Sequence, residues 1–252
     1  MVDWFTINII IVGVLGVILG SLIGVLRYPK KTTMYLMFAF AAGVMLAVSF
    51  LELLPEAVDE SGVVIALIGF FVGITLFYLI DKLFLHKPTL IVSRKDKSLK
   101  KTAWLLIIAL AVHNFPEGMA LGIASISEAT TAIIIALAIA IHNLPEGIVA
   151  SAPYYHATKK RMRAFLLGSM TAIPLIIGFL FADFLFSLLP EVAIGFVFAL
   201  TAGIMTYISV SELIPNAKET TNKLWGRPAV IAFVSGIFLI VLLEIVFLGG
   251  VL

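Results

Sequence analysis

Two neighbouring stretches share one pattern: TAWLLIIALAVHNFPEGMALGIA at residues 102–124 and TTAIIIALAIAIHNLPEGIVASA at residues 130–152. Each is long enough as a helix to cross a hydrocarbon core of about 30 Å. At the centre of each lies the hexapeptide His-Asn-x-Pro-Glu-Gly, at 113–118 and 142–147. Because ionisable side chains are costly at bilayer depth, their presence there indicates a functional site.

The rest of the chain has the composition of a polytopic membrane protein. Of its 252 residues, 62% are hydrophobic and 13% are charged, whereas about a quarter of the residues in a soluble domain are charged. We expect one all-α transmembrane domain over residues 1–252, with 4–26 as a retained first span because it lacks a basic n-region and a cleavage site. The eight predicted spans are 4–26, 33–54, 62–80, 102–124, 130–152, 164–187, 192–214 and 228–250.

The basic residues predict the orientation of these spans. All 17 Lys and Arg residues lie in the gaps after the first, third, fifth and seventh spans, and the other gaps carry acids. By the positive-inside rule, the basic loops are cytoplasmic and both termini lie outside. The net charge of +2 therefore reflects topology, and no nucleic-acid partner is expected.

A second internal similarity relates segment 39–57, AFAAGVMLAVSFLELLPEA, to segment 199–217, ALTAGIMTYISVSELIPNA. The two match at nine of nineteen positions with a constant offset of 160. They lie on the second and seventh predicted spans, which cross in opposite directions. We therefore predict a 3+2+3 inverted-repeat bundle, in which three spans, a central pair and three spans surround a pseudo-two-fold axis in the membrane plane.

The paired hexapeptides supply ligands for a divalent cation. In a helix, the glutamate lies three and four residues from the asparagine and the histidine, so it can share a ligand with either. Imidazole with carboxylate suits zinc or iron, and amide with carboxylate suits harder ions. With no cysteine in the chain, thiolate sites are excluded. The candidate ligands are His113, Asn114, Glu117, His142, Asn143 and Glu146.

Other interpretations of the His/Glu pairs stay open. They could relay protons or organic ions, or form a hydrogen-bonded packing element. A membrane-embedded metalloenzyme is a further alternative, but the chain lacks His-Glu-x-x-His and Glu-x-x-His patterns. We therefore expect a transporter and not an enzyme, with no prosthetic group.

Residues outside the hexapeptides have two interpretations each. Met45 could line the path with its thioether or fill the core. Glu52 and Glu212 could act as outer and inner gate ligands, or cap helix ends and reach water. A stripe of Gly16, Gly20 and Gly24 predicts close helix packing within one protomer or in a homodimer. Three acids near span ends are expected at the interface: Asp81, Asp183 and Glu244.

These hexapeptides, with the segment at 43–46, resemble the ZIP family of zinc and iron transporters, and within it the bacterial ZupT type, over essentially the whole chain. The resemblance implies zinc uptake into the cytoplasm across a bacterial inner (plasma) membrane, with iron, manganese and cadmium as possible further substrates. It implies a first metal on Glu117, His142 and Glu146, with His113 and Met45 nearby. It implies a second metal on Asn114, Glu117, Asn143 and Glu146.

Two departures from that family pattern affect the expected site. Many relatives place a glutamate on the sixth span just before a proline, but here Ile173 precedes Pro174. The second metal site is therefore expected to lack one carboxylate. The loop before the fourth span has only His86 where relatives often have histidine-rich stretches, so metal sensing by that loop is not expected.

Overall fold

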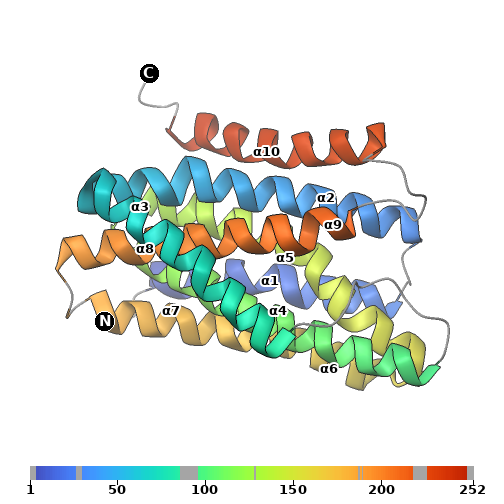
Figure 1. Cartoon of the computed structure of the whole chain (residues 1–252). Coiled ribbons are helices and arrows are strands. Elements are labelled where there is room, and N and C mark those ends of the chain that lie inside the picture. Colours follow the sequence, from blue (N-terminus) through green and yellow to red (C-terminus); the bar gives the residue numbers. More distant parts are fainter. Residues whose placement is uncertain are drawn as a thin grey trace.

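The computed structural model describes residues 4–26, 30–85, 96–127, 129–186, 188, 190–217 and 226–248. Within these residues the protein is helical and contains no strand, and the helices lie alongside one another in a bundle (Figure 1). In this described part of the chain, six helical segments are long and apolar enough to cross a membrane. The prediction of an all-α membrane protein is confirmed.

The elements follow one another as α1 (Trp4–Leu26), α2 (Lys31–Ala47), η1 (Val48–Leu53), α3 (Leu54–Ile80), η2 (Asp81–Leu85), α4 (Asp96–Ser127), α5 (Ala129–Thr158), α6 (Arg161–Ser169), η3 (Met170–Ala172), α7 (Ile173–Phe186), α8 (Glu191–Ile208), η4 (Ser209–Leu213), α9 (Ile214–Asn216) and α10 (Arg227–Leu248). Helix α1 begins and helix α10 ends at the same end of the bundle (Figure 1).

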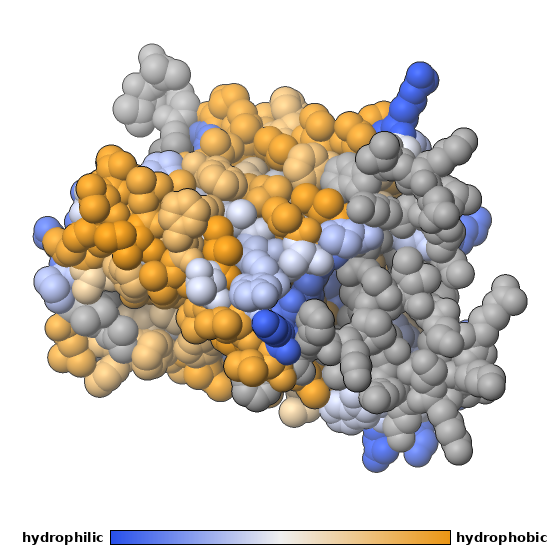
Figure 2. Space-filling model, in the orientation of Figure 1, coloured by the Kyte–Doolittle hydropathy of each residue, from blue (hydrophilic) through white to orange (hydrophobic). Residues whose placement is uncertain are grey.

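The outer surface of the bundle is apolar. Hydrophobic residues make up most of the coloured surface in Figure 2, and the hydrophilic groups lie mainly towards the two ends and in a patch at the centre. Large apolar side chains such as Val64 and Phe238 are 71% and 63% exposed. A surface of this kind fits contact with lipid tails, since soluble monomers rarely expose extensive apolar patches.

The longest uninterrupted helical segment, Tyr35–Leu83, turns at a single glycine. It has 49 residues, which at about 1.5 Å per residue is more than twice the thickness of a hydrocarbon core. Gly62 has φ 78° and ψ 159°, a backbone conformation that a residue without a Cβ adopts readily. The sequence predicts that a span ends at residue 54. Instead, the helix continues past this boundary to Ser61.

The helices pack in two groups. In one group α1 packs on α5, α4 packs on α7 and on α5, and α6 joins α1 and α5. In the other, α3 packs on α8 and α10 packs on α2. Contacts of α2 with α5 and of α4 with α8 hold the groups together.

The glycine stripe of α1 is used within the protomer. A Cβ on Gly16 or Gly20 would meet the backbone carbonyl of Ala140 or Leu144 on α5, and Gly24 faces Ser151 of the same helix. Small residues allow backbones to approach this closely. The stripe therefore fixes α1 against the helix that carries the second hexapeptide.

Glycine contacts in the second group occur in matching pairs. Gly43 of α2 packs on the carbonyl of Phe233 in α10, and Gly203 of α8 packs on the carbonyl of Phe70 in α3. The residue offset is 160 between the two glycines and 163 between their two partners. Gly236 packs on the carbonyl of Phe40, and Gly73 packs on the carbonyl of Leu200. In this second pair the two offsets are exchanged, with 163 between the glycines and 160 between their partners.

The two similar segments also share a backbone irregularity. Both α2 and α8 pass into a π-helix, η1 and η4, and each π-helix ends two residues before a proline. Ser49 and Ser209 each donate a hydrogen bond of 2.8 Å to the carbonyl four residues earlier, on Met45 and Met205. Single π-helical turns are rare and frequently mark functional sites.

Candidate metal centre

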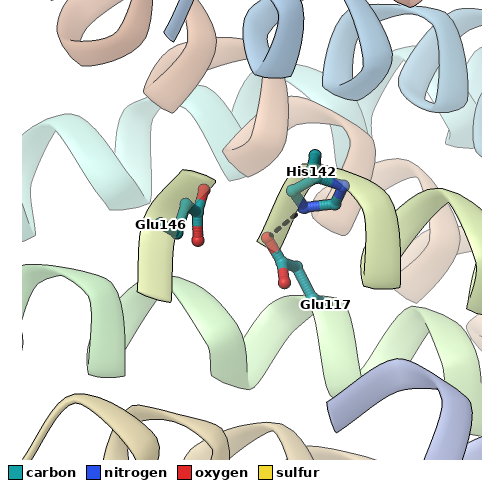
Figure 3. A group of neighbouring side chains, drawn as sticks. All are labelled: Glu117, His142 and Glu146. Atoms are coloured by element: carbon teal, nitrogen blue, oxygen red, sulfur yellow. Dashed lines mark hydrogen bonds and ion pairs between the residues drawn. The ribbon is translucent and has the colours of Figure 1, made fainter. Parts of the chain in front are cut away.

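A buried cluster of three side chains joins α4 to α5 (Figure 3). Each of Glu117, His142 and Glu146 offers one ligand atom, and these atoms lie within 4.8 Å of one another. The three side chains are at most 2% exposed. Among the residues that the structure describes, this is the one group of three or more such side chains that could hold a metal ion.

The imidazole of His142 is oriented from both sides. Its Nδ1 lies 2.8 Å from the carbonyl oxygen of Ala138, and its Nε2 lies 3.0 Å from Oε1 of Glu117. Because a carbonyl only accepts, Nδ1 donates, as the second nitrogen of a metal-binding histidine usually does. Two electron-rich atoms 3.0 Å apart need a cation between them, either a proton or a metal.

Two asparagine amides lie beside this cluster with their oxygens unused. Asn143 Nδ2 donates to Oε2 of Glu117 at 3.2 Å, and Asn114 Nδ2 donates to the carbonyl of Thr171 at 2.7 Å. Both Oδ1 atoms are buried and have no hydrogen-bond partner within the described ranges. Leaving such an oxygen buried without a hydrogen bond costs about 1–3 kcal/mol of stability. Coordination of a cation by the oxygen would offset this cost.

The proline and glycine of each hexapeptide set the helices around the site. Pro116 and Pro145 lie inside α4 and α5, where a proline removes one helical N–H and loosens the turn. Gly118 packs on the carbonyl of Leu175 in α7, and Gly147 packs on the carbonyl of Val17 in α1. Each close contact fixes the height of the glutamate that precedes the glycine.

The short turn η3, between α6 and α7, contributes a backbone group to the surroundings of the cluster, not a carboxylate. Ile173, at the position where the sequence suggests a missing acid, is 44% exposed, whereas Thr171 is 2% exposed. The Thr171 carbonyl belongs to the 3₁₀ turn η3, and Pro174 has no N–H to donate to it in the 3₁₀ pattern. Thr171 is not among the residues predicted from the sequence, although Pro174, three residues later, indicates a carbonyl that has no helical donor.

Of the other residues predicted from the sequence, the structure describes Met45 but not the side chains of His113 and Asp183. Met45 is fully buried in the main hydrophobic cluster, on a helix that contacts α5. The side chains of His113 and Asp183, and the whole of His86, lie outside the described part of the chain. The role proposed for His113 therefore stays a prediction.

The two candidate gate residues each lie beside a second acid. Glu52 is 8% exposed and its side chain lies beside that of Glu244 of α10, so it does not extend to water. Glu212 lies near Tyr207, whose hydroxyl donates to Oδ2 of Asp81 at 2.8 Å. Asp81 and Glu244, expected as interfacial acids, are thus paired across helices.

Sequence comparisons show the family to which the chain belongs. A sequence model described as ZIP Zinc transporter matches residues 85–244, well over half of the chain and inclusive of both hexapeptides. The chain belongs to the ZIP zinc transporter family. It is similar to the zinc transporter ZupT of Chlorobaculum parvum, with 42% identity over 224 residues that cover 80% of this chain and 83% of the relative.

Two further relatives of this ZIP protein are also zinc transporters named ZupT. The protein from Chlorobium chlorochromatii is 38% identical over 236 residues, which cover 84% of this chain and 87% of the relative. The protein from Streptococcus mutans is 36% identical over 218 residues, which cover 80% and 83%. The ZIP resemblance is confirmed, and the chain is a multi-pass membrane transporter, not an enzyme.

Proposed function

We propose that this ZIP-family protein carries Zn²⁺ across the cytoplasmic membrane of a bacterium and into the cell, with Glu117, His142 and Glu146 as its central binding site. The observation that carries the proposal is the burial of two carboxylates and an imidazole within 4.8 Å of one another. Zinc binds imidazole nitrogen and carboxylate oxygen at about 2.0–2.2 Å. A shared ion would draw these atoms together from two helices.

The charges of the cluster favour a divalent ion. Two ionised glutamates carry a charge of about −2, which is expensive to bury without compensation. All 17 Lys and Arg residues lie in the gaps between the predicted spans, so none is expected at this depth. A single Zn²⁺ with a neutral imidazole would make the site neutral.

A second ion position is proposed beside the first. The orphan oxygens of Asn114 and Asn143 would complete it, with Glu117 and Glu146 as bridging ligands. Because this set consists of oxygen atoms alone, it suits a harder ion such as manganese better than the imidazole-containing position does. We propose manganese, with iron and cadmium, as secondary substrates.

We further propose eight crossings in the 3+2+3 inverted-repeat arrangement, with both termini outside. The turn at Gly62 supports two crossings within Tyr35–Leu83, and α4, with 32 residues, supplies the remaining one. The matched glycine contacts and the two π-helices support the repeat. Because α1 begins and α10 ends at the same end of the bundle (Figure 1), an even number of crossings is supported.

The separate packing of the two helix groups supports transport by a relative movement of the groups. In this scheme the group of α4 and α5 carries the ion against the group of α2 and α8. Glu52 with Glu244, and Glu212 near the other end of the path, would act as gate groups. Each lies on or beside a π-helical turn, a feature that is frequent at functional sites.

Flux measurements test this proposal directly. Purified protein in liposomes that contain a zinc-sensitive dye is expected to admit Zn²⁺, and Glu117→Ala is expected to admit almost none. Leu144→Ala serves as the control, because Leu144 lies between the ligands in sequence without offering a donor atom. Proton flux in the absence of metal, with no zinc flux, would favour the proton-carrier alternative instead.

A further inference from the structure

The connection between α5 and α6 concentrates positive charge on the surface. A two-residue turn, Lys159–Lys160, joins the helices, and Arg161 and Arg163 follow in the first turn of α6. All four side chains are exposed. No acidic residue occurs in the sequence between Glu146 and Asp183, so the charge of this turn is not neutralised by its own segment.

This basic turn is held in one shape. Lys159 has a φ of 56° and its N–H donates to the carbonyl of Tyr155 at 2.8 Å, as in a helix C-terminal cap. The N–H of Lys160 donates to Thr158 Oγ1 at 3.3 Å. The guanidinium of Arg161 lies over the Tyr155 ring, 5.5 Å from its centroid, and Nη2 donates to the ring hydroxyl at 3.4 Å. Tyrosine rings are frequent at the level of lipid headgroups.

An exposed apolar stripe runs away from the basic turn along α6 and α7. Its side chains recur at intervals of three or four residues, which places them on one face of the helical segment Arg161–Ala182. Their exposed fractions lie between 44% and 68%. The members of the stripe are Met162, Leu166, Met170, Ile173 and Ile177.

We propose that the basic turn and the apolar stripe together bind an anionic phospholipid of the membrane leaflet that the turn faces. The phosphate of the headgroup lies among Lys160, Arg161 and Arg163, and an acyl chain lies along Met162 and Leu166. A basic cluster at the end of a membrane span attracts anionic headgroups, and the adjoining stripe selects a lipid over a soluble phosphate. Since the turn follows α5 directly, the lipid binds next to the C-terminal end of the helix that carries His142 and Glu146.

Lipid titrations of the full-length protein, followed by native mass spectrometry, test the proposal without any metal. Wild-type protein is expected to bind phosphatidylglycerol more tightly than phosphatidylcholine. Each basic side chain near an anionic headgroup contributes about five-fold in affinity, so Lys160→Gln/Arg161→Gln/Arg163→Gln is expected to lose on the order of a hundredfold. The matched control, Lys30→Gln/Lys82→Gln/Arg227→Gln, removes three exposed charges from other gaps and is expected to retain binding.

Three results would overturn the proposal: no preference of the wild type for phosphatidylglycerol, equal losses in the two triple variants, or binding of inorganic phosphate as tight as that of the lipid. The variant Met162→Gln/Leu166→Gln keeps the charges, and its unchanged lipid affinity would contradict the acyl-chain contact. If the triple variant does not elute as a folded protein, Arg161→Gln alone replaces it, with an expected loss of about five-fold.

Discussion

Glu117→Gln removes one charge from the candidate metal centre and leaves the shape of the side chain unchanged. Both carboxylate oxygens have partners, His142 Nε2 at 3.0 Å and Asn143 Nδ2 at 3.2 Å. A glutamine can donate to the first and accept from the second, so the buried hydrogen bonds survive without a shared proton. The fold is therefore expected to be as stable as the wild type, or more stable, in the absence of metal.

The loss of zinc affinity follows from the uncompensated charge. With one carboxylate left, a bound Zn²⁺ keeps a net charge of about +1 in a site that is at most 2% exposed. Removing one member of a buried charge pair costs about 3–5 kcal/mol, which corresponds to about two to four orders of magnitude in Kd. Zinc transport at micromolar concentrations is expected to fall to the background of empty liposomes.

Competition with a fluorescent zinc chelator measures this Kd, and dye-filled liposomes measure the flux. Glu191→Gln is the matched control, because it makes the same chemical change at an exposed acid in the first turn of α8. Thermal unfolding without metal separates loss of binding from loss of fold. A Kd within about tenfold of wild type, with normal flux and an intact fold, would refute the role of Glu117.

Four other outcomes are expected. His142→Ala should weaken zinc binding by at least about tenfold while Leu144→Ala does not, as measured by the same competition assay; equal effects would exclude a ligand role for the imidazole. Zinc binding should release at least one proton, because His142 Nε2 and Glu117 Oε1 share one at 3.0 Å, and affinity should therefore fall as the pH is lowered; calorimetry in buffers of different ionisation enthalpy measures the release, and an absence of released protons would contradict it. Gly20→Val should lower the Tm, since its side chain would meet the Leu144 carbonyl and overpacking costs about 1–3 kcal/mol; Leu19→Val at an exposed position is the control, and equal Tm values for the two would be inconsistent with close α1–α5 packing. Glu244→Leu should destabilise the fold by about 1–3 kcal/mol by removing the partner of buried Glu52, whereas Glu244→Gln should not, and unfolding curves that do not distinguish them would argue against the pair.

The side chains of the site could be predicted because their chemistry is local. A histidine and a glutamate four residues apart share one helix face whatever the rest of the chain does. Burial at bilayer depth follows from the apolar residues on both sides. Glu117, His142 and Glu146 therefore meet as the two hexapeptides predict.

Features that depend on the backbone could not be predicted in the same way. The carbonyl of Thr171 orients Asn114, and any residue type offers a carbonyl. The residues from 55 to 61, which contain proline and acids, look like a loop in sequence, yet they stay helical because Gly62 alone makes the turn. Likewise, the π-helices at Glu52 and Glu212 differ from α-helices only in hydrogen-bond pattern, which side-chain periodicity does not encode.

Contacts between residues that are far apart in the sequence could not be predicted either. Glu52 and Glu244 look like separate interfacial acids because they lie on the second and last spans. Their proximity depends on how α2 packs on α10, and that packing is set by Gly43 and Gly236 on opposite sides of one helix contact. Single-sequence periodicity identifies such faces but does not match one face to another.

Anomalous X-ray scattering from crystals grown with zinc gives the most direct test of the central claim. Data collected on both sides of the zinc absorption edge are expected to place an ion at about 2.0–2.2 Å from one atom each of Glu117, His142 and Glu146. A strong zinc peak elsewhere in the membrane-spanning region, with His142 and Glu117 still bonded to each other as they are in Figure 3, would contradict it.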